Sequence, residues 1–460
     1  MPIRPLKVDH SIDTDIGSIL SGASFDSSAL SYSIIIQTPN EEIPIDTLIS
    51  IEQLRDYANN ICDHTLVSFT IAAGLYIKRV LPHIDNLEII LITQRYGHSY
   101  KDRYKLLIAN GPSNTAGTMY SSYSEAELNK MDQFVIEGQC LNRLVEALRY
   151  EQVNGVYNKT TVKDVMTTLY HNAISNIKIG GTPSLANVDI VAPNNARVYD
   201  HISVPTGVNL LDLPTYLQLT HYGVYNGDIG TYIQRYGYFT PTNTPPKDTV
   251  FIYPLYNNLR TDELGKKLSI FATPTTQLSK IDRSFIVDGD VIKIIGGGDM
   301  TANEITQTKL MDGGNAAIVS SPSNIMLGKH DTTDSTAKVN SKDNVTGVRF
   351  KTKVDGVDGA KYISPRDNIY KVHSEVAKNA LSPYQVTWNF SNPELLHPGM
   401  PVTYIYQDAE LGVIKLTGTL HSCFNKYVRS NKAWMTILNI LLEPIQEGVT
   451  KHTTVVDARR

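Results

Sequence analysis

Histidine and cysteine are the residue types in this chain that could bind a metal or act as nucleophiles, but their spacing favours neither role. The sequence has 12 histidines and no His-Glu-x-x-His motif. The histidines that come closest to forming groups are His64, His83 and His98, and His201 and His221. No two of them have ligand spacing on one element, so solvated or core side chains are the favoured interpretation.

The 3 cysteines, Cys62, Cys140 and Cys423, lie far apart and form no Cys-x-x-Cys motif. A thiol nucleophile would need a histidine held beside it, and sequence spacing alone identifies none. We therefore expect buried or half-buried thiols without a chemical role.

A glycine run offers the next candidate for chemistry, a phosphate-binding loop. Gly296-Gly297-Gly298-Asp299 follows the apolar run from Val291 to Ile295, and such a loop could cradle a phosphate at a helix N-terminus. However, the run lacks both Gly-x-Gly-x-x-Gly and Gly-x-x-x-x-Gly-Lys-Ser/Thr spacing, and no βαβ unit follows. The pattern favours a flexible turn.

The acidic residues show no catalytic or calcium-binding pattern. Four aspartates lie in Asp-Gly turns without the spacing of a calcium loop, namely Asp288, Asp290, Asp355 and Asp358. Glu125 and Glu127 fall on an expected solvated helix face and give no support for a glycosidase pair. There is no Gly-x-Ser-x-Gly motif, and the Ser-x-x-Lys at Ser175 has no companion motif. The sequence therefore predicts no catalytic, cofactor-binding or metal-binding residue, and a protein that is not an enzyme.

Composition points to a soluble, well-cored chain. Its 460 residues suit about three domains, and 41% of them are hydrophobic. The net charge of -4 argues against a nucleic-acid-binding protein. No apolar stretch is long enough for a transmembrane helix. The start, Met1 to Lys7, has no signal-peptide core, so we expect folding in a cytoplasm without stable membrane insertion.

The N-terminal third reads as an arm over residues 1–27 and a β-barrel domain over residues 28–155. Short runs rich in strand-forming residues follow one another closely, as in barrels and sandwiches. These runs are Ala29–Gln37, Thr65–Gly74, Leu75–Val80, Leu87–Thr93 and Arg103–Ile108. Apolar spacing predicts a short helix over Ile51–Cys62.

Residues 156–360 read as a mixed α/β middle region. Apolar residues at helical spacing predict helices over Thr161–Ser175 and Leu210–Thr220, and Thr249–Leu255 reads as a buried strand. A polar stretch near residues 330–343 predicts a mobile loop.

Residues 361–446 read as a second small β-barrel, followed by a tail over residues 447–460. A helix is expected over Pro365–Ala377. The strands expected after it are Tyr384–Phe390, Val402–Tyr406, Val413–His421 and Trp434–Leu442. The fold class is thus α+β, mainly β, with two small β-barrel domains flanking the mixed middle region.

Two parts of the chain resemble a known family. One is Leu210-Leu211-Asp212-Leu213-Pro214-Thr215-Tyr216-Leu217 with the strand Phe251–Leu255. The other is the C-terminal block, in which Pro398-Gly399-Met400-Pro401-Val402 starts a strand and a second strand reaches Leu420-His421. In this order of elements the chain resembles the baseplate hub of large contractile-tailed bacteriophages, a family related to the hub part of type VI secretion spike proteins.

The resemblance implies a structural protein of the virion tail baseplate, assembled in the host cytoplasm. It implies a homotrimer in which each chain carries two similar barrels, so that three chains form a pseudo-sixfold ring between the sixfold tail tube and the threefold spike. The implied partners are copies of itself, the tube protein, the spike protein, other baseplate proteins and the tape-measure protein. The alternatives are a baseplate wedge, a tube-initiator protein or a tail-associated hydrolase.

Overall fold

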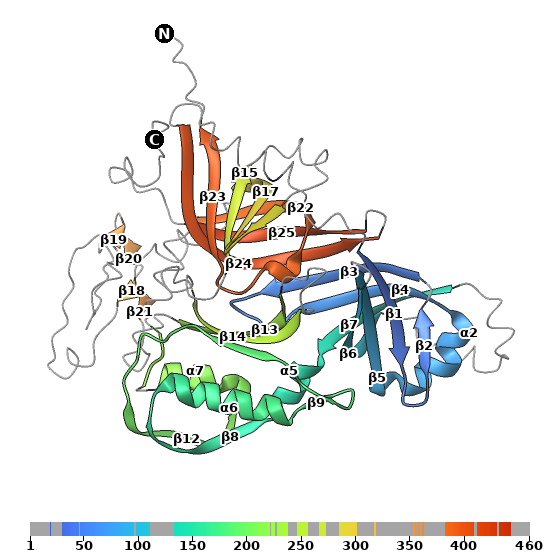
Figure 1. Ribbon diagram of the computed structural model, residues 1–460, viewed down its shortest axis with the longest axis horizontal. Helices are drawn as coiled ribbons and strands as arrows, with labels where there is room; N and C mark the ends of the chain where they lie inside the picture. Colours follow the sequence, from blue (N-terminus) through green and yellow to red (C-terminus); the bar gives the residue numbers. More distant parts are fainter. Residues whose placement is uncertain are drawn as a thin grey trace, which may run out of the picture.

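The computed structural model describes most of the chain. The described residues are 19, 30–45, 47–95, 98–110, 133–220, 222–225, 228–237, 246–255, 266–272, 285–300, 382–408, 412–429 and 432–442, with four short strands between 317 and 362. The N-terminal barrel, called barrel 1, lies to the right in Figure 1. The C-terminal barrel, called barrel 2, lies at the top, with the middle region beneath it. The predicted fold class, mainly β with two barrels and a mixed middle region, is confirmed.

Barrel 1 is a sheet that returns upon itself. Its strands are β1 (Ser31–Gln37), β2 (Glu42–Ile45), β3 (Thr47–Asp56), β4 (His64–Ala72), β5 (Leu87–Arg95), β6 (His98–Asn110) and β7 (Gln133–Asn142). They pair in the order β2-β1-β5-β6-β7-β4-β3. Because a single residue separates β2 from β3, one stretch of chain pairs with β1 at its start and β4 at its end, which closes the ring. Alternation on β4 turns Val67, Phe69 and Ile71 into the core.

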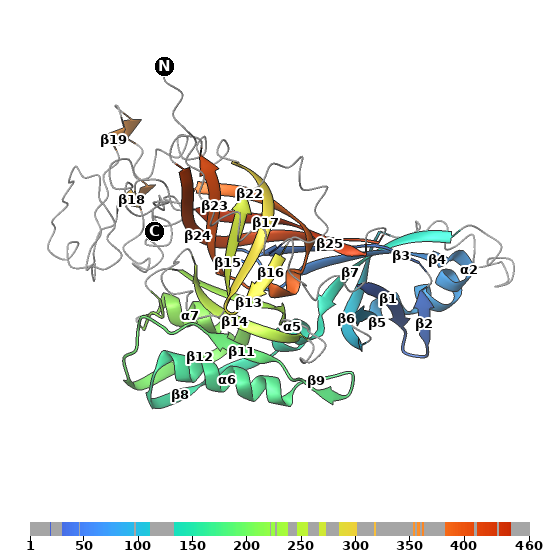
Figure 2. The same ribbon diagram turned by 45° about the horizontal axis from the view of Figure 1, so that its top comes forward.

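Barrel 2 is also closed, here by direct pairing of the two end strands of its sheet, β24 and β25. Its strands are β15 (Lys267–Ala272), β17 (Val291–Met300), β22 (Ser382–Ser391), β23 (Pro401–Asp408), β24 (Gly412–Val428) and β25 (Ala433–Leu442). They pair in the order β24-β23-β15-β17-β22-β25, and β25 pairs again with β24 (Figure 2). We expected the range that contains strands β15 and β17 to belong to the middle region. It belongs to barrel 2 because these strands pair with β23 and β22, which lie far along the chain, and local sequence pattern does not reveal such pairing.

The two barrels have the same cyclic strand order. Each barrel can be described by six strands numbered in chain order, if β2 and β3 count as one strand of barrel 1. In both barrels the neighbours around the ring are then strands 1, 2, 3, 6, 5 and 4, and strand 4 lies beside strand 1. One strand differs in direction. Strand β1 is antiparallel to both of its neighbours, whereas β15 is parallel to both of its ring neighbours. The chain therefore contains two barrels of closely similar topology.

One long strand joins the barrels. The first half of β24 pairs with β23, and its second half, residues 422–428, pairs with β3 over residues 50–56. Tyr427 at the end of β24 and Trp434 at the start of β25 belong to the core of barrel 1, where the Trp434 indole donates to the Tyr32 hydroxyl at 2.9 Å. Because barrel 2 supplies core residues to barrel 1, the two are parts of one folding unit.

The middle region places two helices between two small sheets. Strands β8 (Gln152–Thr160) and β12 (Tyr199–Asn209) form one sheet. Strands β11 (Asn187–Ile190), β13 (Asp228–Tyr236) and β14 (Lys247–Leu255) form the other. Helix α6 (Val162–Asn176) contacts β8 and β11, and α7 (Leu213–Leu219) contacts β12 and β13. Both predicted helices are confirmed. Helix α6 begins where the Thr161 hydroxyl accepts from the Asp164 amide at 3.2 Å.

The remaining elements are short. They are α2 (Ala73–Leu75), η2 (Tyr76–Val80), η3 (Leu81–Asn86), α5 (Arg143–Leu148), β9 (Lys178–Ile179), β10 (Thr182–Pro183), η4 (Leu210–Asp212), β16 (Phe285–Asp288), β18 (Ala317–Ile318), β19 (Lys353–Val354), β20 (Val357–Asp358), β21 (Lys361–Tyr362) and η6 (Pro393–Leu395). No helix in the described part of the chain is long and apolar enough to cross a membrane.

Three local predictions are wrong. The helix expected over Ile51–Cys62 is instead largely strand β3, because cross-strand partners on β4 and β24 override a weak helical spacing. The strand expected over Leu75–Val80 is a helical turn that buries Tyr76, Ile77 and Val80. The glycine run expected as a turn lies in β17, where a Cβ at Gly296 would come within 2.5 Å of the Val386 side chain.

Other expectations fall outside the described residues. These are the helix over residues 365–377, the loop near residues 330–343, the C-terminal tail and all of the N-terminal arm except Ile19.

Alternation along β22 predicts that Val386, Trp388 and Phe390 share a core face, and two of these three residues lie in the core. Val386 and Trp388 are fully buried, and the Trp388 ring meets Phe285 edge-on at 5.4 Å. Phe390 is only half-buried because the register shifts between Asn389 and Ser391, where Phe390 has φ +51°.

We expect Trp388→Ala to lower the free energy of unfolding by about 3–5 kcal/mol, because it leaves a cavity in the core of barrel 2. Urea denaturation monitored by circular dichroism measures the change. Tyr150→Ala is the matched control, since Tyr150 is 79% exposed and its truncation should change stability by about 0.5 kcal/mol or less. Equal melting of the Trp388 variant and the parent would contradict the assignment of this face.

Candidate functional site

Among the candidate histidines, those with described side chains are His64, His83 and His201, and they form no metal-binding group. His64 is exposed on β4. His83 Nε2 lies 3.2 Å from Asn40 Nδ2, and His201 Nδ1 lies 2.7 Å from Asn158 Oδ1. The side chain of His98 and all of His221 are outside the described residues. Within the described part of the chain, no group of three His, Cys, Asp or Glu side chains is placed to hold a metal.

The cysteines lie in or beside the cores. Burial raises the pKa of Cys62 and Cys140 to about 12 and that of Cys423 to about 11. The Cys423 sulfur lies 3.9 Å from the Tyr57 hydroxyl, at the seam between β24 and β3. These thiols stay protonated at neutral pH, which disfavours the thiolate that nucleophilic chemistry requires.

The most developed side-chain constellation is a buried polar cluster where the three regions meet. Arg55 on β3 is 1% exposed, and its Nε donates to Asp63 Oδ2 at 3.1 Å. Its Nη1 donates to the carbonyl of Pro393 in η6 at 2.6 Å. The Tyr232 hydroxyl on β13 donates to Asp63 Oδ1 at 2.9 Å. This ion pair of barrel 1 is thus hydrogen-bonded both to the middle region and to η6, which lies between β22 and β23 of barrel 2.

The protonation of this cluster is set by two opposed effects. Burial raises the pKa of the Asp63 carboxyl, and the positive charge of Arg55 lowers it. Desolvation likewise opposes the charge on Arg55, but the nearby Asp63 carboxylate favours it, and the pKa of Arg55 lies above its usual value. With the guanidinium and the Tyr232 hydroxyl both donating to the carboxylate, we assign the ion pair as the state at neutral pH.

A second polar contact docks the middle region on barrel 1. Arg235 on β13 forms an ion pair with Asp102 on β6, and its guanidinium lies 5.0 Å from the centre of the Tyr100 ring. The Tyr100 hydroxyl donates to Glu394 Oε1 at 3.3 Å, and Asn142 Nδ2 donates to Asp248 Oδ1 at 3.0 Å. These pairs could not be predicted from local pattern, because charged residues on strands usually face solvent and the partners lie more than a hundred residues apart.

A buried histidine lies where the middle region meets barrel 2. His397 is fully buried between the rings of Tyr236 and Phe251. Its Nδ1 lies 3.1 Å from the Pro398 carbonyl and its Nε2 lies 3.0 Å from the Lys266 carbonyl. Burial lowers its pKa. The imidazole therefore packs between the middle region and the start of β15, which indicates a structural role for His397.

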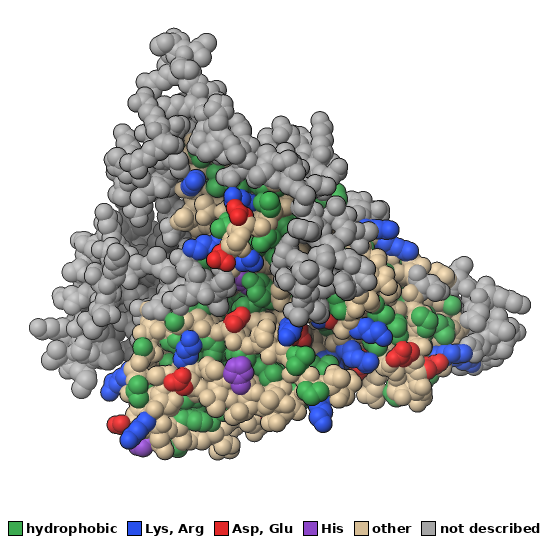
Figure 3. Space-filling view, in the orientation of Figure 1, with side chains coloured by type: hydrophobic (Ala, Val, Ile, Leu, Met, Phe, Trp, Pro, Cys, Tyr) green, Lys and Arg blue, Asp and Glu red, His purple; other side chains and the backbone are tan. Residues whose placement is uncertain are grey.

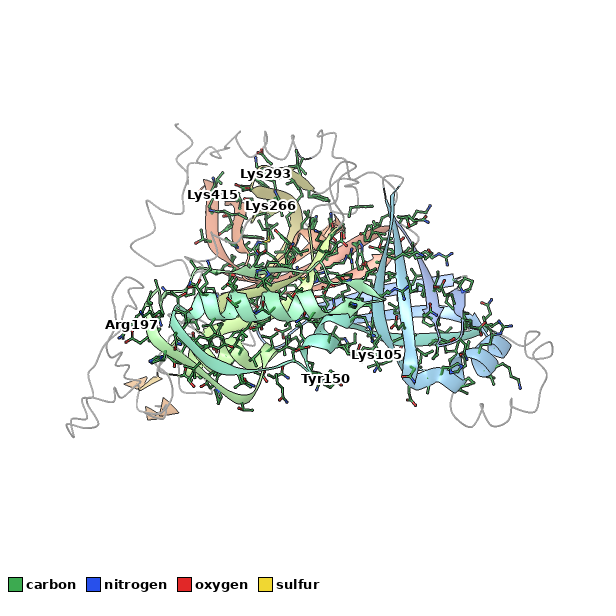
Figure 4. The ribbon with its side chains drawn as sticks, turned by 60° about the horizontal axis from the view of Figure 1, so that its bottom comes forward. Lys105, Tyr150, Arg197, Lys266, Lys293 and Lys415 are labelled. Atoms are coloured by element: carbon green, nitrogen blue, oxygen red, sulfur yellow. The ribbon has the colours of Figure 1, made fainter. Side chains whose placement is uncertain are left out.

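The surface of the middle region offers the clearest interaction features. Its exposed large apolar side chains are Tyr150, Val156, Leu185, Val198 and Leu219, each more than half exposed. Apolar side chains are visible along the lower part of the face in Figure 3, and Figure 4 shows Tyr150 and Arg197 at separate points of this region. Single exposed apolar side chains are common on soluble proteins, so these residues are candidate contact points for other proteins and do not define a patch.

Open strand edges also lie in the middle region. Both barrels close, and closure removes sheet edges. Among the described strands, β8 and β12 pair only with each other, so each keeps one unpaired side. Strand β11 likewise pairs only with β14, and β16 pairs only with β17 on barrel 2, so the described edges available for pairing between subunits include these strands as well as β8 and β12.

Comparison with known proteins finds matches among solved structures only. No family model and no curated protein matches the chain. A tail protein from Neisseria meningitidis MC58 has a TM-score of 0.42 and 10% identity, covering 89% of this chain and 96% of that chain. The 43 kDa tail protein of prophage MuSo2 from Shewanella oneidensis has a TM-score of 0.45 and 10% identity, covering 90% of this chain and 100% of that chain.

A third match is a Francisella PdpA-VgrG complex. Its TM-score is 0.41 with 11% identity, covering 94% of this chain and 55% of that chain. The chain is thus similar to two tail proteins and to a PdpA-VgrG complex, each at 10–11% identity.

Arg55→Met should destabilise the protein by about 3–5 kcal/mol at neutral pH, because it leaves the Asp63 carboxylate buried without its partner. In this variant burial still raises the pKa of Asp63 but the opposing charge of Arg55 is gone, so the folded-state pKa rises further above the unfolded value of about 3.9 even though the Tyr232 hydroxyl still donates to the carboxylate. The stability of the variant should then be greatest below that unfolded pKa and fall as pH rises through the raised folded pKa. Thermal melting from pH 3.5 to 8 measures this.

Two variants serve as controls for this prediction. Arg55→Met with Asp63→Asn should lose the pH dependence, because no titrating carboxyl remains. Arg79→Met removes an exposed ion pair with Glu41 at 3.0 Å and should cost about 1 kcal/mol or less. A similar loss in the Arg55 and Arg79 variants would show that the buried cluster has no special role.

In the native protein at pH 8, Cys140 and Cys423 should react with a disulfide reagent such as DTNB far more slowly than a free thiol. With a pKa of about 12 for Cys140, about one thiol in ten thousand is ionised at that pH, and access is limited by burial. All 3 thiols should react quickly in 8 M urea. An immediate stoichiometric reaction of either buried thiol in the folded protein would contradict its core position.

Proposed function

We propose that this protein is a structural component of a phage tail baseplate and, more specifically, its trimeric central hub. The observation that carries the proposal is the presence of two barrels with the same cyclic strand order in one chain. Three copies of such a chain supply six similar barrels, so a threefold assembly can present a nearly sixfold ring. This arrangement would join a sixfold tail tube to a threefold spike.

The junction between the barrels supports a rigid ring element. Strands β3 and β24 pair directly, and the buried pair of Arg55 and Asp63 lies at the end of the same seam. The spacing of the two barrels is therefore fixed within the chain. A protein whose role is geometric needs this rigidity and no catalytic group.

The proposed partners follow from this position. They are copies of the chain itself, the tube protein, the spike protein, other baseplate proteins and the tape-measure protein, with assembly in the host cytoplasm. The unpaired sides of β8 and β12 and the exposed side chains of the middle region provide contact surfaces for them. A wedge or tube-initiator role would use similar surfaces with a different copy number.

We expect an obligate homotrimer that buries about 2,000–5,000 Å² per interface, as permanent complexes do. Light scattering should give three times the 51.1 kDa mass of the chain, and electron micrographs should show six barrels in a threefold ring. Three copies per baseplate support the hub, whereas six copies around another central protein would indicate a wedge. A stable monomer at micromolar concentration, with other than three copies in the particle, would contradict the hub.

The enzyme alternative has a separate test. Hydrolysis of peptidoglycan by the purified protein, abolished by one side-chain substitution that leaves the fold intact, would favour a tail-associated hydrolase.

A further inference from the structure

The outer face of barrel 2 carries an apolar row. Phe271 on β15 lies directly opposite Ile295 on β17 and Ile405 on β23, and Val413 on β24 lies diagonal to Ile405. Their chain neighbours Ile270, Ile294, Tyr404 and Ile414 face the barrel interior and belong to its core. Because side chains alternate along a strand, the row faces outward, where a barrel in water would present polar residues.

The row is short and bordered by polar residues. Two positions away along the same strands are Ser269, Lys293, Thr403 and Lys415. Lys293 and Lys415 are labelled on barrel 2 in Figure 4, with Lys266 nearby. The four apolar residues form one compact cluster, defined here as the outer patch, with half-buried Ile286 against it. Its edge is rich in lysine.

The outer patch is covered. Its four side chains are between 1% and 7% exposed although they lie outside the barrel. Ile19 belongs to the same cluster and is itself fully buried. Ile19 comes from the N-terminal segment, 11 residues before Leu30. The patch therefore contacts a side chain that is remote in sequence from every strand of barrel 2.

Charge is complementary between the segment and the patch. From Val8 to Leu30 the sequence has four aspartates, Asp9, Asp13, Asp15 and Asp26, and no lysine or arginine. An acidic segment with an apolar anchor matches an apolar patch that is bordered by lysines. The chain is also held further on, where the Tyr427 hydroxyl donates to the Leu30 carbonyl at 3.0 Å.

We propose that the outer patch is a docking site for the N-terminal segment of the same chain, with Ile19 as its anchoring side chain. Docking keeps an apolar surface of barrel 2 from associating with other molecules. It also ties the start of the chain to barrel 2 at Ile19 and to the junction of the barrels at Leu30. This site is independent of the hub proposal, since it needs neither a ring nor a partner protein.

Disulfide trapping in the full-length protein tests the site directly. The variant with Ile19→Cys and Val413→Cys should form a disulfide within one chain under mild oxidation, seen by mass spectrometry. The control pairs Ile19→Cys with Val135→Cys, because Val135 is 58% exposed on barrel 1 and lies outside the patch. A yield no higher than that of the control would overturn the proposal.

Mixing experiments identify the occupant. The single variants Ile19→Cys and Val413→Cys are mixed and oxidised, and the proposal predicts little disulfide between chains. A predominant disulfide between chains would show that a second copy fills the patch and would overturn docking within one chain. The result does not depend on whether the assembly is a trimer, so failure of the hub proposal remains distinguishable.

Uncovering the patch gives a second readout. Ile19→Asp should raise the binding of the apolar dye ANS several-fold and weaken docking by about 10- to 100-fold, as expected for loss of one buried isoleucine. Ile3→Asp is the matched control and should leave dye binding unchanged. If Ile19→Asp prevents folding, Ile19→Ser is used, and the disulfide experiment still decides. Unchanged dye binding in a folded Ile19 variant would count against the proposal.

Discussion

The pairing of β3 with β24 is the contact on which the rest of the structure depends. Seven residues of β24 pair with β25 of barrel 2 on one side and with β3 of barrel 1 on the other, so both barrels share one 14-stranded sheet. The same extension carries Tyr427, and β25 carries Trp434, into the core of barrel 1. Backbone hydrogen bonds and shared apolar burial therefore fix the spacing between the barrels, and neither core is complete without the other.

Near the contact of β3 with β24, the protein buries charged side chains, although apolar side chains would carry a smaller desolvation cost. The pair of Arg235 and Asp102 joins the middle region to barrel 1, and the pair of Arg55 and Asp63 lies within barrel 1 and accepts a hydrogen bond from Tyr232 of the middle region. Buried ion pairs contribute little net stability, but each partner is strongly unfavourable when left alone. Such pairs penalise any other arrangement of the middle region on the barrels. We infer that they contribute mainly to the uniqueness of the arrangement, which is the property a geometric role requires.

The repetition of one barrel topology within a chain connects fold and proposed function. Closed barrels have no open edges, so they stay soluble while they are held side by side. The unpaired sides of β8 and β12 lie in the middle region, whereas exposed apolar residues lie both there and on barrel 1, where Val135 is 58% exposed. On barrel 2, the apolar row that does face outward is covered by Ile19 of the N-terminal segment. Surfaces available to partners therefore occur on the middle region and on barrel 1.

Patterns within single elements were determined by the sequence alone. The spacing of Val162, Val165 and Met166 predicted α6, and the alternation of Val386 and Trp388 predicted a core face, because these periodicities arise from local backbone geometry. Because the sequence has no metal-binding or nucleophile motif, we expected a structural protein. Pairing between distant strands was decided only by the tertiary structure. It made Ile51 part of a strand, placed Gly296 in a barrel wall, brought Tyr232 to Asp63 and covered the outer patch with Ile19, since each of these depends on partners that local sequence does not encode.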